Sequence, residues 1–166
     1  MFSLNAPVPG TVAKLAAELR PELVPFDRVR DRHTLVLKRF EERSIDRVRK
    51  RLRGVLRPTP AFQARVVGVD YFAEPASGAA PVVYLAVDSP GLRDAHDRLV
   101  GAFGAVEGLE GPDYVPHVTL ARGGDVADAR RLRDRAVQPV TWTVSKLQLW
   151  DARYREVVGS VGLPVR

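Results

Sequence analysis

The chain has 166 residues and contains no cysteine. The absence of cysteine excludes disulfides, thiolate metal sites and cysteine nucleophiles, and it is typical of a reducing compartment. No run of 18 apolar residues occurs, so no membrane-spanning helix is predicted. Residues 1–5 lack the basic and apolar regions of a signal peptide, and we therefore expect a cytoplasmic protein without a membrane partner.

Signatures of several common active sites are missing as well. The sequence has no His-Glu-x-x-His pattern and no acidic cluster, so a mechanism without a metal or another cofactor is the simpler expectation. No Gly-x-Ser-x-Gly motif of a serine hydrolase occurs. Gly123-Gly124 lacks the rest of a phosphate-binding loop and is predicted to form a turn.

Basic residues, in contrast, are in excess. The net charge is +6, and residues 28–57 hold twelve Lys and Arg against four Asp and Glu. Such a segment attracts polyanions, among which RNA, DNA and an anionic membrane are all candidates. The same residues also fit a solvated, arginine-rich helix face, so charge alone does not decide between these interpretations.

Hydrophobic periodicity predicts alternating strands and helices in a single domain. Strands are expected at residues 2–5, 32–40, 63–72, 82–87, 115–121, 141–150 and 156–163. Helices are expected at residues 11–19, 44–56, 92–103 and 125–137, with Thr11, Ser44 and Asp125 as caps. His96 falls on the apolar side of its predicted helix, where a structural role is the better interpretation.

The order strand, helix, strand, helix, strand occurs twice, before and after a Pro/Ala/Gly/Ser-rich stretch at residues 74–81. His33 and His117 lie on corresponding strands, 84 residues apart. This self-similarity indicates a duplication, with lobes at roughly 1–73 and 81–166 of one bilobal domain spanning 1–166. A pseudo-twofold axis between the lobes would make their central strands face each other across a cleft.

The clearest motif is Pro116-His117-Val118-Thr119-Leu120. Side chains alternate along a strand, so His117 and Thr119 share one face while Val118 and Leu120 pack into the lobe. An imidazole that moves a proton near neutral pH suits phosphate chemistry beside a hydroxyl that binds a phosphoryl oxygen. Arg122 follows two residues after the motif and is expected on the same face, where it would neutralise a phosphate.

The corresponding segment, Arg32-His33-Thr34-Leu35, has its histidine and threonine adjacent. In one interpretation a bulge turns His33 into the cleft beside Thr34. In the other, strict alternation places Arg32 where a catalytic histidine would be, and His33 is buried. We favour His33 as the functional residue because a two-base site needs a second imidazole. Lys38, near the end of this strand, is a candidate phosphate contact.

Paired His-x-Thr-hydrophobic motifs in a duplicated fold resemble the two-histidine (2H) phosphoesterase superfamily, and within it the bacterial LigT-like group. The similarity covers nearly the whole chain, and its second motif, His117 to Leu120, matches at every position. The resemblance implies an α+β fold of two pseudo-twofold related lobes of antiparallel sheet, with helices outside and a central cleft. It also implies an RNA substrate ending in a 2',3'-cyclic phosphate that is opened to a 2'-phosphate, and a capacity to join or split 2'-5' linkages.

The resemblance further implies roles for individual residues. One of His33 and His117 would act as general base and the other as general acid, in an order that the sequence leaves open, and Thr34, Thr119, Arg122 and Lys38 would bind the phosphate. The resulting hypothesis is a metal-independent cyclic phosphodiesterase or 2'-5' RNA ligase that processes RNA as a monomer. The alternative is an RNA-binding module on the same scaffold, with catalysis weakened by the altered first motif. The orientation of His33 discriminates between the two.

Overall fold

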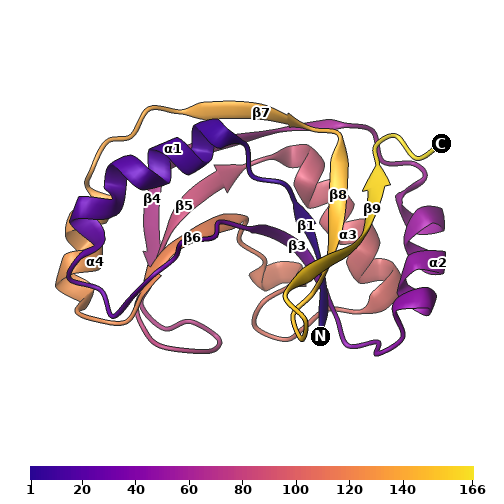
Figure 1. The fold of residues 1–166 in the computed structure, drawn as a ribbon, viewed down its shortest axis with the longest axis horizontal. Coiled ribbons are helices and arrows are strands. Elements are labelled where there is room, and N and C mark those ends of the chain that lie inside the picture. Colours follow the sequence, from indigo (N-terminus) through magenta and orange to yellow (C-terminus); the bar gives the residue numbers. More distant parts are fainter.

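The computed structural model describes all 166 residues, which form one curled antiparallel sheet and four helices (Figure 1). The strands are β1 (Phe2–Ala6), β2 (Arg28–Val29), β3 (Leu35–Phe40), β4 (Phe62–Phe72), β5 (Val82–Asp88), β6 (His117–Arg122), β7 (Val140–Val144), β8 (Lys146–Asp151) and β9 (Glu156–Gly162). The helices are α1 (Gly10–Leu19), α2 (Ile45–Leu56), α3 (Pro90–Phe103) and α4 (Val126–Arg133). None of these helices has the length and apolar character needed to cross a membrane.

The two strands that carry the sequence motifs lie at the centre of the sheet. The strand order is β7-β4-β5-β6-β3-β1-β8-β9, and the short β2 also pairs with β6. Counting outward from the β6–β3 pair, β5 corresponds to β1 and β4 to β8. This arrangement agrees with the repeated order of elements in the sequence, although the duplication itself stays a prediction.

Each half of the sheet combines strands from both halves of the chain. α1 and α4 lie near β4 and β5, whereas α2 and α3 lie at the other end of the molecule near β1, β8 and β9 (Figure 1). β4 pairs with β5 and β7, while β8 returns across the molecule to pair with β1. The strand predicted at residues 141–150 is therefore two strands, because the chain changes its pairing partner at Ser145.

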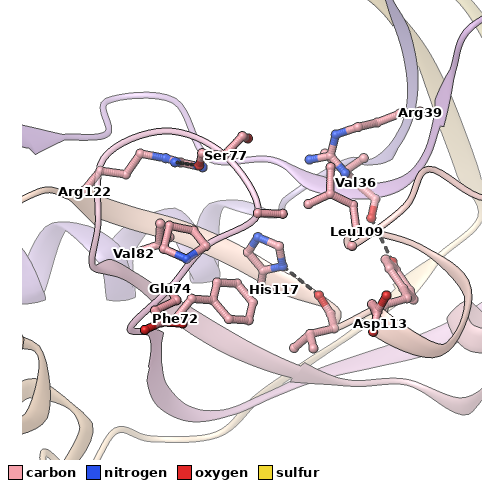
Figure 2. A pocket seen from close by; sticks show the side chains of 15 residues that line it. Val36, Arg39, Phe72, Glu74, Ser77, Val82, Leu109, Asp113, His117 and Arg122 are labelled. Atoms are coloured by element: carbon pink, nitrogen blue, oxygen red, sulfur yellow. Dashed lines mark hydrogen bonds between the residues drawn. The ribbon is translucent and has the colours of Figure 1, made fainter.

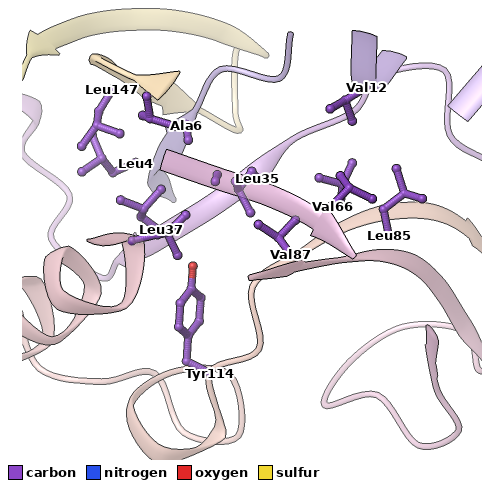
Figure 3. Packing of buried hydrophobic residues seen from close by; sticks show 14 of the residues in the cluster. Leu4, Ala6, Val12, Leu35, Leu37, Val66, Leu85, Val87, Tyr114 and Leu147 are labelled. Carbon is purple, nitrogen blue, oxygen red and sulfur yellow. The ribbon is translucent and has the colours of Figure 1, made fainter. Parts of the chain in front are cut away.

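One face of the sheet packs against the helices and forms the hydrophobic core. Leu35, Leu85 and Val118 are fully buried and belong to one cluster with Val12 of α1 and Leu92 of α3. Figure 3 shows part of this cluster around β1, β3 and β4. Full burial of each such side chain contributes about 1.5–3 kcal/mol relative to exposure. The core fixes which face of β3 and β6 points away from the helices.

The predicted helices are confirmed, but some of their ends differ. Ser89 caps α3 by accepting a hydrogen bond from the Leu92 backbone N–H. Thr11 was expected to cap α1, and this was wrong, because α1 begins at Gly10 after Pro9 and Thr11 lies inside it. α4 ends at Arg133, short of the predicted residue 137.

Candidate active site

His117 and Thr119 project from β6 on the face opposite the core. Their neighbours Val118 and Leu120 are fully buried in the core. β3 and β6 pair antiparallel with Leu35 opposite Val118. This register sets Val36 beside His117, and Thr34 beside Thr119, on the far side of the sheet.

A cleft runs over this central pair of strands and has two parts. The arginine part has a volume of about 490 Å³ and is lined by Arg30, Arg32, Thr34, Val36, Arg39, His117, Thr119, Arg122, Trp150, Ala152 and Arg155. The loop part is of similar volume, about 490 Å³, and adds Phe72, Glu74, Pro75, Ala76, Ser77, Val82, Gly108, Leu109, Asp113, Tyr114 and Val115 (Figure 2). Val36, Arg39, His117 and Arg122 line both parts, so the cleft is continuous through His117.

The imidazole of His117 is held in one orientation. Its Nδ1 lies 2.6 Å from the Val115 carbonyl oxygen (Figure 2). A carbonyl only accepts hydrogen bonds, so Nδ1 carries the proton and Nε2 is left with a free lone pair when the ring is neutral. The ring also contacts Phe72 and Tyr84, each with a centroid separation of 5.2 Å. This imidazole can therefore take up a proton through Nε2.

Burial lowers the pKa of His117, and the charges of Arg39 and Arg122 lower it further. The hydrogen bond to Val115 acts in the opposite direction and stabilises the protonated form. The net result is a pKa below the ordinary value, so the ring is neutral at neutral pH. In that state His117 is suited to accept a proton rather than donate one.

The arginine part of the cleft is an anion-binding site by composition. Five of its lining residues are arginines, and none is acidic. Arg122 donates a hydrogen bond from Nη1 to the Ser77 carbonyl at 2.8 Å, but its buried Nε–H has no partner. Burial lowers the pKa of Arg122, and the nearby Arg30 and Arg39 lower it further. A phosphate group would supply both an acceptor for this Nε–H and a counter-charge.

The structure does not bring His33 and His117 together. Arg32 and Thr34 line the cleft, whereas His33 lines a cavity of about 190 Å³ beside α1 and one of about 300 Å³ next to β1 and β8. Burial lowers the pKa of His33, and the nearby Asp31 raises it in part. The side chains of residues 32–36 therefore alternate strictly between the two faces of the sheet, without a bulge at His33. Arg32 occupies the place expected for a second catalytic histidine.

Lys38 was expected to contact phosphate, and the structure places it elsewhere. Leu4 is opposite Lys38 while Asn5 is opposite Val36, so Leu37 forms a bulge in β3. The bulge turns Lys38 into the protein, where its Nζ lies 2.6 Å from Glu110 Oε2 and both side chains are almost fully buried. The next residue, Arg39, takes the position in the cleft.

A second bulge places Arg122 where it was expected. Strict alternation from His117 would put Ala121 on the cleft face and Arg122 on the core face. Thr119 is opposite Tyr84 while Ala121 is opposite Val83, so the pairing of β6 with β5 shifts by one residue at Leu120. Ala121 is consequently buried, and Arg122 lines the cleft.

His96 has a structural role, as predicted. Its Nδ1 lies 2.6 Å from the Leu37 carbonyl, and its Nε2 accepts a hydrogen bond from the Gly111 backbone N–H at 3.0 Å. The ring is fully buried and stacks on Tyr114 at 3.7 Å between centroids. Both ring nitrogens are satisfied, so His96 has no free lone pair for chemistry. No group of three or more His, Asp or Glu residues is arranged to hold a metal ion.

Among the charged and aromatic residues that line the arginine part of the cleft, sequence reasoning missed three: Arg30, Trp150 and Arg155. Trp150 was visible in the sequence only as the end of a predicted strand. In the structure its ring packs against the Arg32 guanidinium, whose carbon lies 3.6 Å from the ring centroid. Arg155 is the last residue of the β8–β9 turn and has a backbone φ of 56°, a conformation that sequence patterns do not reveal.

Comparison with known proteins gives one family and a set of similar structures. The family model described as the 2'-5' RNA ligase superfamily matches residues 8–155. The structure of TT0787 from Thermus thermophilus is 20% identical with a TM-score of 0.69, covering 99% of this chain and 98% of that one. E. coli LigT in complex with 3'-AMP is 17% identical with a TM-score of 0.67, covering 98% and 97%. No curated protein sequence matches. These structures confirm the predicted LigT-like α+β fold.

Proposed function

The chain belongs to the 2'-5' RNA ligase superfamily, and we propose on this basis that it acts on phosphate esters at RNA ends. The substrate is RNA that ends in a 2',3'-cyclic phosphate, which the protein opens to a 2'-phosphate in the central cleft. The observation that carries this proposal is the free Nε2 of His117 in a cleft lined by five arginines and two threonines. The same arrangement would join RNA ends when the 5'-hydroxyl of a second RNA, in place of water, attacks the cyclic phosphate and the bond to the 3'-oxygen breaks, which leaves a 2'-5' linkage.

In this proposal His117 is the proton carrier. Nε2 of the neutral ring removes a proton from water as the water oxygen attacks phosphorus. The bond between phosphorus and the 3'-oxygen breaks, the released alkoxide is protonated by solvent, and His117 then returns its proton to solvent. Thr34 and Thr119 donate hydrogen bonds to the phosphoryl oxygens, and Arg39 and Arg122 stabilise their developing charge.

Arg32 replaces the second imidazole in position but not in chemistry. A guanidinium stays protonated in proteins, so it supplies charge without supplying a proton. Proton transfer by one positioned group is typically worth a factor of about 10² to 10⁴ in rate. The protein is therefore proposed to be a slow cyclic phosphodiesterase compared with an enzyme that uses two histidines.

A second candidate function is an RNA-binding module without turnover. The position of Arg32 in the cleft, and of His33 outside it, favours this candidate. Five arginines around one phosphate bind an RNA end whether or not the cyclic phosphate opens. The two candidate functions differ in whether the cyclic phosphate at the bound RNA end is opened.

An oligoribonucleotide with a terminal 2',3'-cyclic phosphate tests both candidates. Binding is measured by fluorescence anisotropy, and ring opening is measured by chromatography, in the presence of EDTA. We expect slow turnover that falls by about 10²-fold or more in His117→Ala and stays within about twofold in His33→Ala. We also expect Arg32→His to raise turnover by at least about tenfold, because it restores a second imidazole at the motif position.

Arg30→His provides the matched control, since it makes the same replacement in the same cleft outside the motif. Binding without turnover in both the wild type and Arg32→His would establish the RNA-binding module instead. Equal turnover by the wild type and His117→Ala would overturn the assignment of His117.

A further inference from the structure

A third cavity adjoins the arginine part of the cleft and takes no part in the proposed chemistry. It has a volume of about 300 Å³, lies next to β1 and β8, and shares Arg32, Thr34 and Trp150 with the cleft. This size is at the lower end for small-molecule sites in proteins. Its remaining polar lining includes Asn5, Gln148 and His33. We call this cavity the β1–β8 pocket.

Asn5 is the unusual residue in the β1–β8 pocket. It is only 7% exposed, and its buried Oδ1 accepts no hydrogen bond within the protein. Buried polar atoms almost always have a partner, so an acceptor without one, beside a cavity, points to a group that enters the cavity and donates. Gln148 is directly opposite Asn5 in the β1–β8 pair and lines the same pocket. Two amide side chains are thus adjacent in the lining of the β1–β8 pocket.

The Arg32 guanidinium and the Trp150 ring form a planar surface that lines both the β1–β8 pocket and the phosphate site. Trp150 lies two residues after Gln148 on the same face of β8, and the Arg32 guanidinium covers its ring at 3.6 Å. Single-stranded RNA bases stack on aromatic rings and on guanidinium planes. Because Arg32 and Trp150 line both cavities, a base stacked on this pair would adjoin a phosphate bound in the cleft.

From these observations we infer that the β1–β8 pocket is a nucleobase subsite for the nucleotide attached to the phosphate in the cleft. The base stacks on the Arg32–Trp150 pair, and an N–H on its pairing edge donates to Asn5 Oδ1. All four RNA bases carry such an N–H group, and the Gln148 amide offers a further donor and acceptor. The inference deepens the proposed function, on which it rests, by naming a base-dependent contribution to substrate binding.

The fluorescence of Trp150 provides the test. Trp142 and Trp150 are the only tryptophans, so Trp142→Phe leaves Trp150 as the single reporter. This protein is titrated with adenosine 2'-monophosphate, ribose 5-phosphate, adenosine and purine riboside, which lacks the adenine amino group. We expect adenosine 2'-monophosphate to quench Trp150 and to bind about 5- to 150-fold more tightly than ribose 5-phosphate. We also expect purine riboside to bind more weakly than adenosine.

Variants of the β1–β8 pocket test whether the base contributes to binding affinity from this pocket. Gln148→Ala and Asn5→Leu should each reduce the advantage of adenosine 2'-monophosphate over ribose 5-phosphate while leaving affinity for ribose 5-phosphate unchanged. Gln138→Ala, at an exposed glutamine that does not line the β1–β8 pocket, should change neither affinity. Asn5 lies in a buried strand, so its replacement can disturb folding, and thermal unfolding checks that Asn5→Leu is folded. Gln148 is only half-buried, so Gln148→Ala tests the same pocket without this risk to folding.

The outcomes separate this inference from the proposed function. Equal affinity for the two phosphates overturns the subsite, since the base then contributes nothing to binding. An advantage that survives in both pocket variants also overturns it, since the base then binds elsewhere, for example in the loop part of the cleft. Turnover of cyclic phosphate without any contribution from the base leaves the proposed function standing alone. Quenching by adenosine without phosphate binding or turnover supports the subsite and removes the proposed function.

Discussion

At the scale of single residues, three features of its surroundings prepare His117 for proton transfer. The Val115 carbonyl fixes the proton on Nδ1, Phe72 and Tyr84 shield the ring, and the neighbouring arginines disfavour a second proton. Tyr84 cannot replace a second imidazole, since burial, assisted by the charge of Asp70, raises its pKa to about 12. His117 is the only histidine that lines either part of the cleft.

The lowered pKa of His117 predicts the pH dependence of turnover. The neutral ring is the active form, and its fraction rises as pH increases through the pKa. Because this pKa is below the ordinary 6.5, kcat/KM should rise with pH to a midpoint below that value and then stay level. A pH series of initial rates on the cyclic-phosphate oligoribonucleotide measures this profile.

The same series on Arg32→His provides the comparison. A second imidazole in the complementary protonation state should add a falling limb and make the profile bell-shaped. A bell-shaped profile already in the wild type, lost in His33→Ala, would contradict the single-imidazole proposal.

Strand alternation read from the sequence locates cleft residues correctly only where the strands are regular. His117, Thr119 and Thr34 follow simple alternation, and each lies in the cleft. Lys38 and Arg122 lie beyond bulges that shift the face by one residue. A bulge depends on pairing with β1 or β5, which are distant in sequence, so local pattern could not reveal it.

At the scale of elements, buried polar contacts fasten the loop before β6 to β3. Glu110 accepts hydrogen bonds from Lys38 Nζ and the Arg39 backbone N–H, both at 2.6 Å, and from the Val106 N–H at 3.0 Å. The loop also reaches Leu37 through His96. These contacts hold residues 104–116, and therefore the start of β6, in a fixed position relative to β3. The position of His117 depends on this loop.

The Lys38–Glu110 ion pair predicts a specific pattern of stability. Removing one partner leaves a buried charge unpaired, so Lys38→Met or Glu110→Leu alone should lower the free energy of unfolding by about 3–5 kcal/mol. The double variant removes both charges and should lose clearly less than the two single losses combined. Urea unfolding followed by circular dichroism measures all four proteins. Additive losses would show that the two charges do not depend on each other.

Helices were easier to predict than the connections between strands. The apolar positions Val48, Leu52 and Leu56 repeat at helical spacing, and all three are buried in α2. The break at Ser145 carries no comparable signal, because β7 and β8 read as one β-rich segment until their partners are known. Tertiary pairing, and not local propensity, separates these strands.

At the scale of the whole molecule, the excess positive charge is divided between two places. The arginines of the cleft come from β3, β6, the segment between β2 and β3 and the β8–β9 turn, and none comes from α2. On α2, Arg49, Arg51 and Arg53 donate hydrogen bonds to the backbone carbonyls of Val158, Ala102 and Arg166. Arg51 also packs on the ring of Phe103 at 4.5 Å. Three of the arginines on α2 thus contact α3, β9 and the C-terminus of the chain.

This division predicts that RNA affinity depends on the cleft and not on α2. For single strands, the slope of log K against log salt falls by about 0.7 for each phosphate contact. Arg122→Ala should weaken binding of the cyclic-phosphate oligoribonucleotide and make the slope shallower by about 0.7. Lys50→Ala removes an exposed charge from α2 and should leave both quantities unchanged. Anisotropy titrations between about 50 and 200 mM salt measure the slopes. A slope that becomes shallower in Lys50→Ala would show that α2 also contacts RNA, and the docking surface would then extend from the cleft to that end of the molecule.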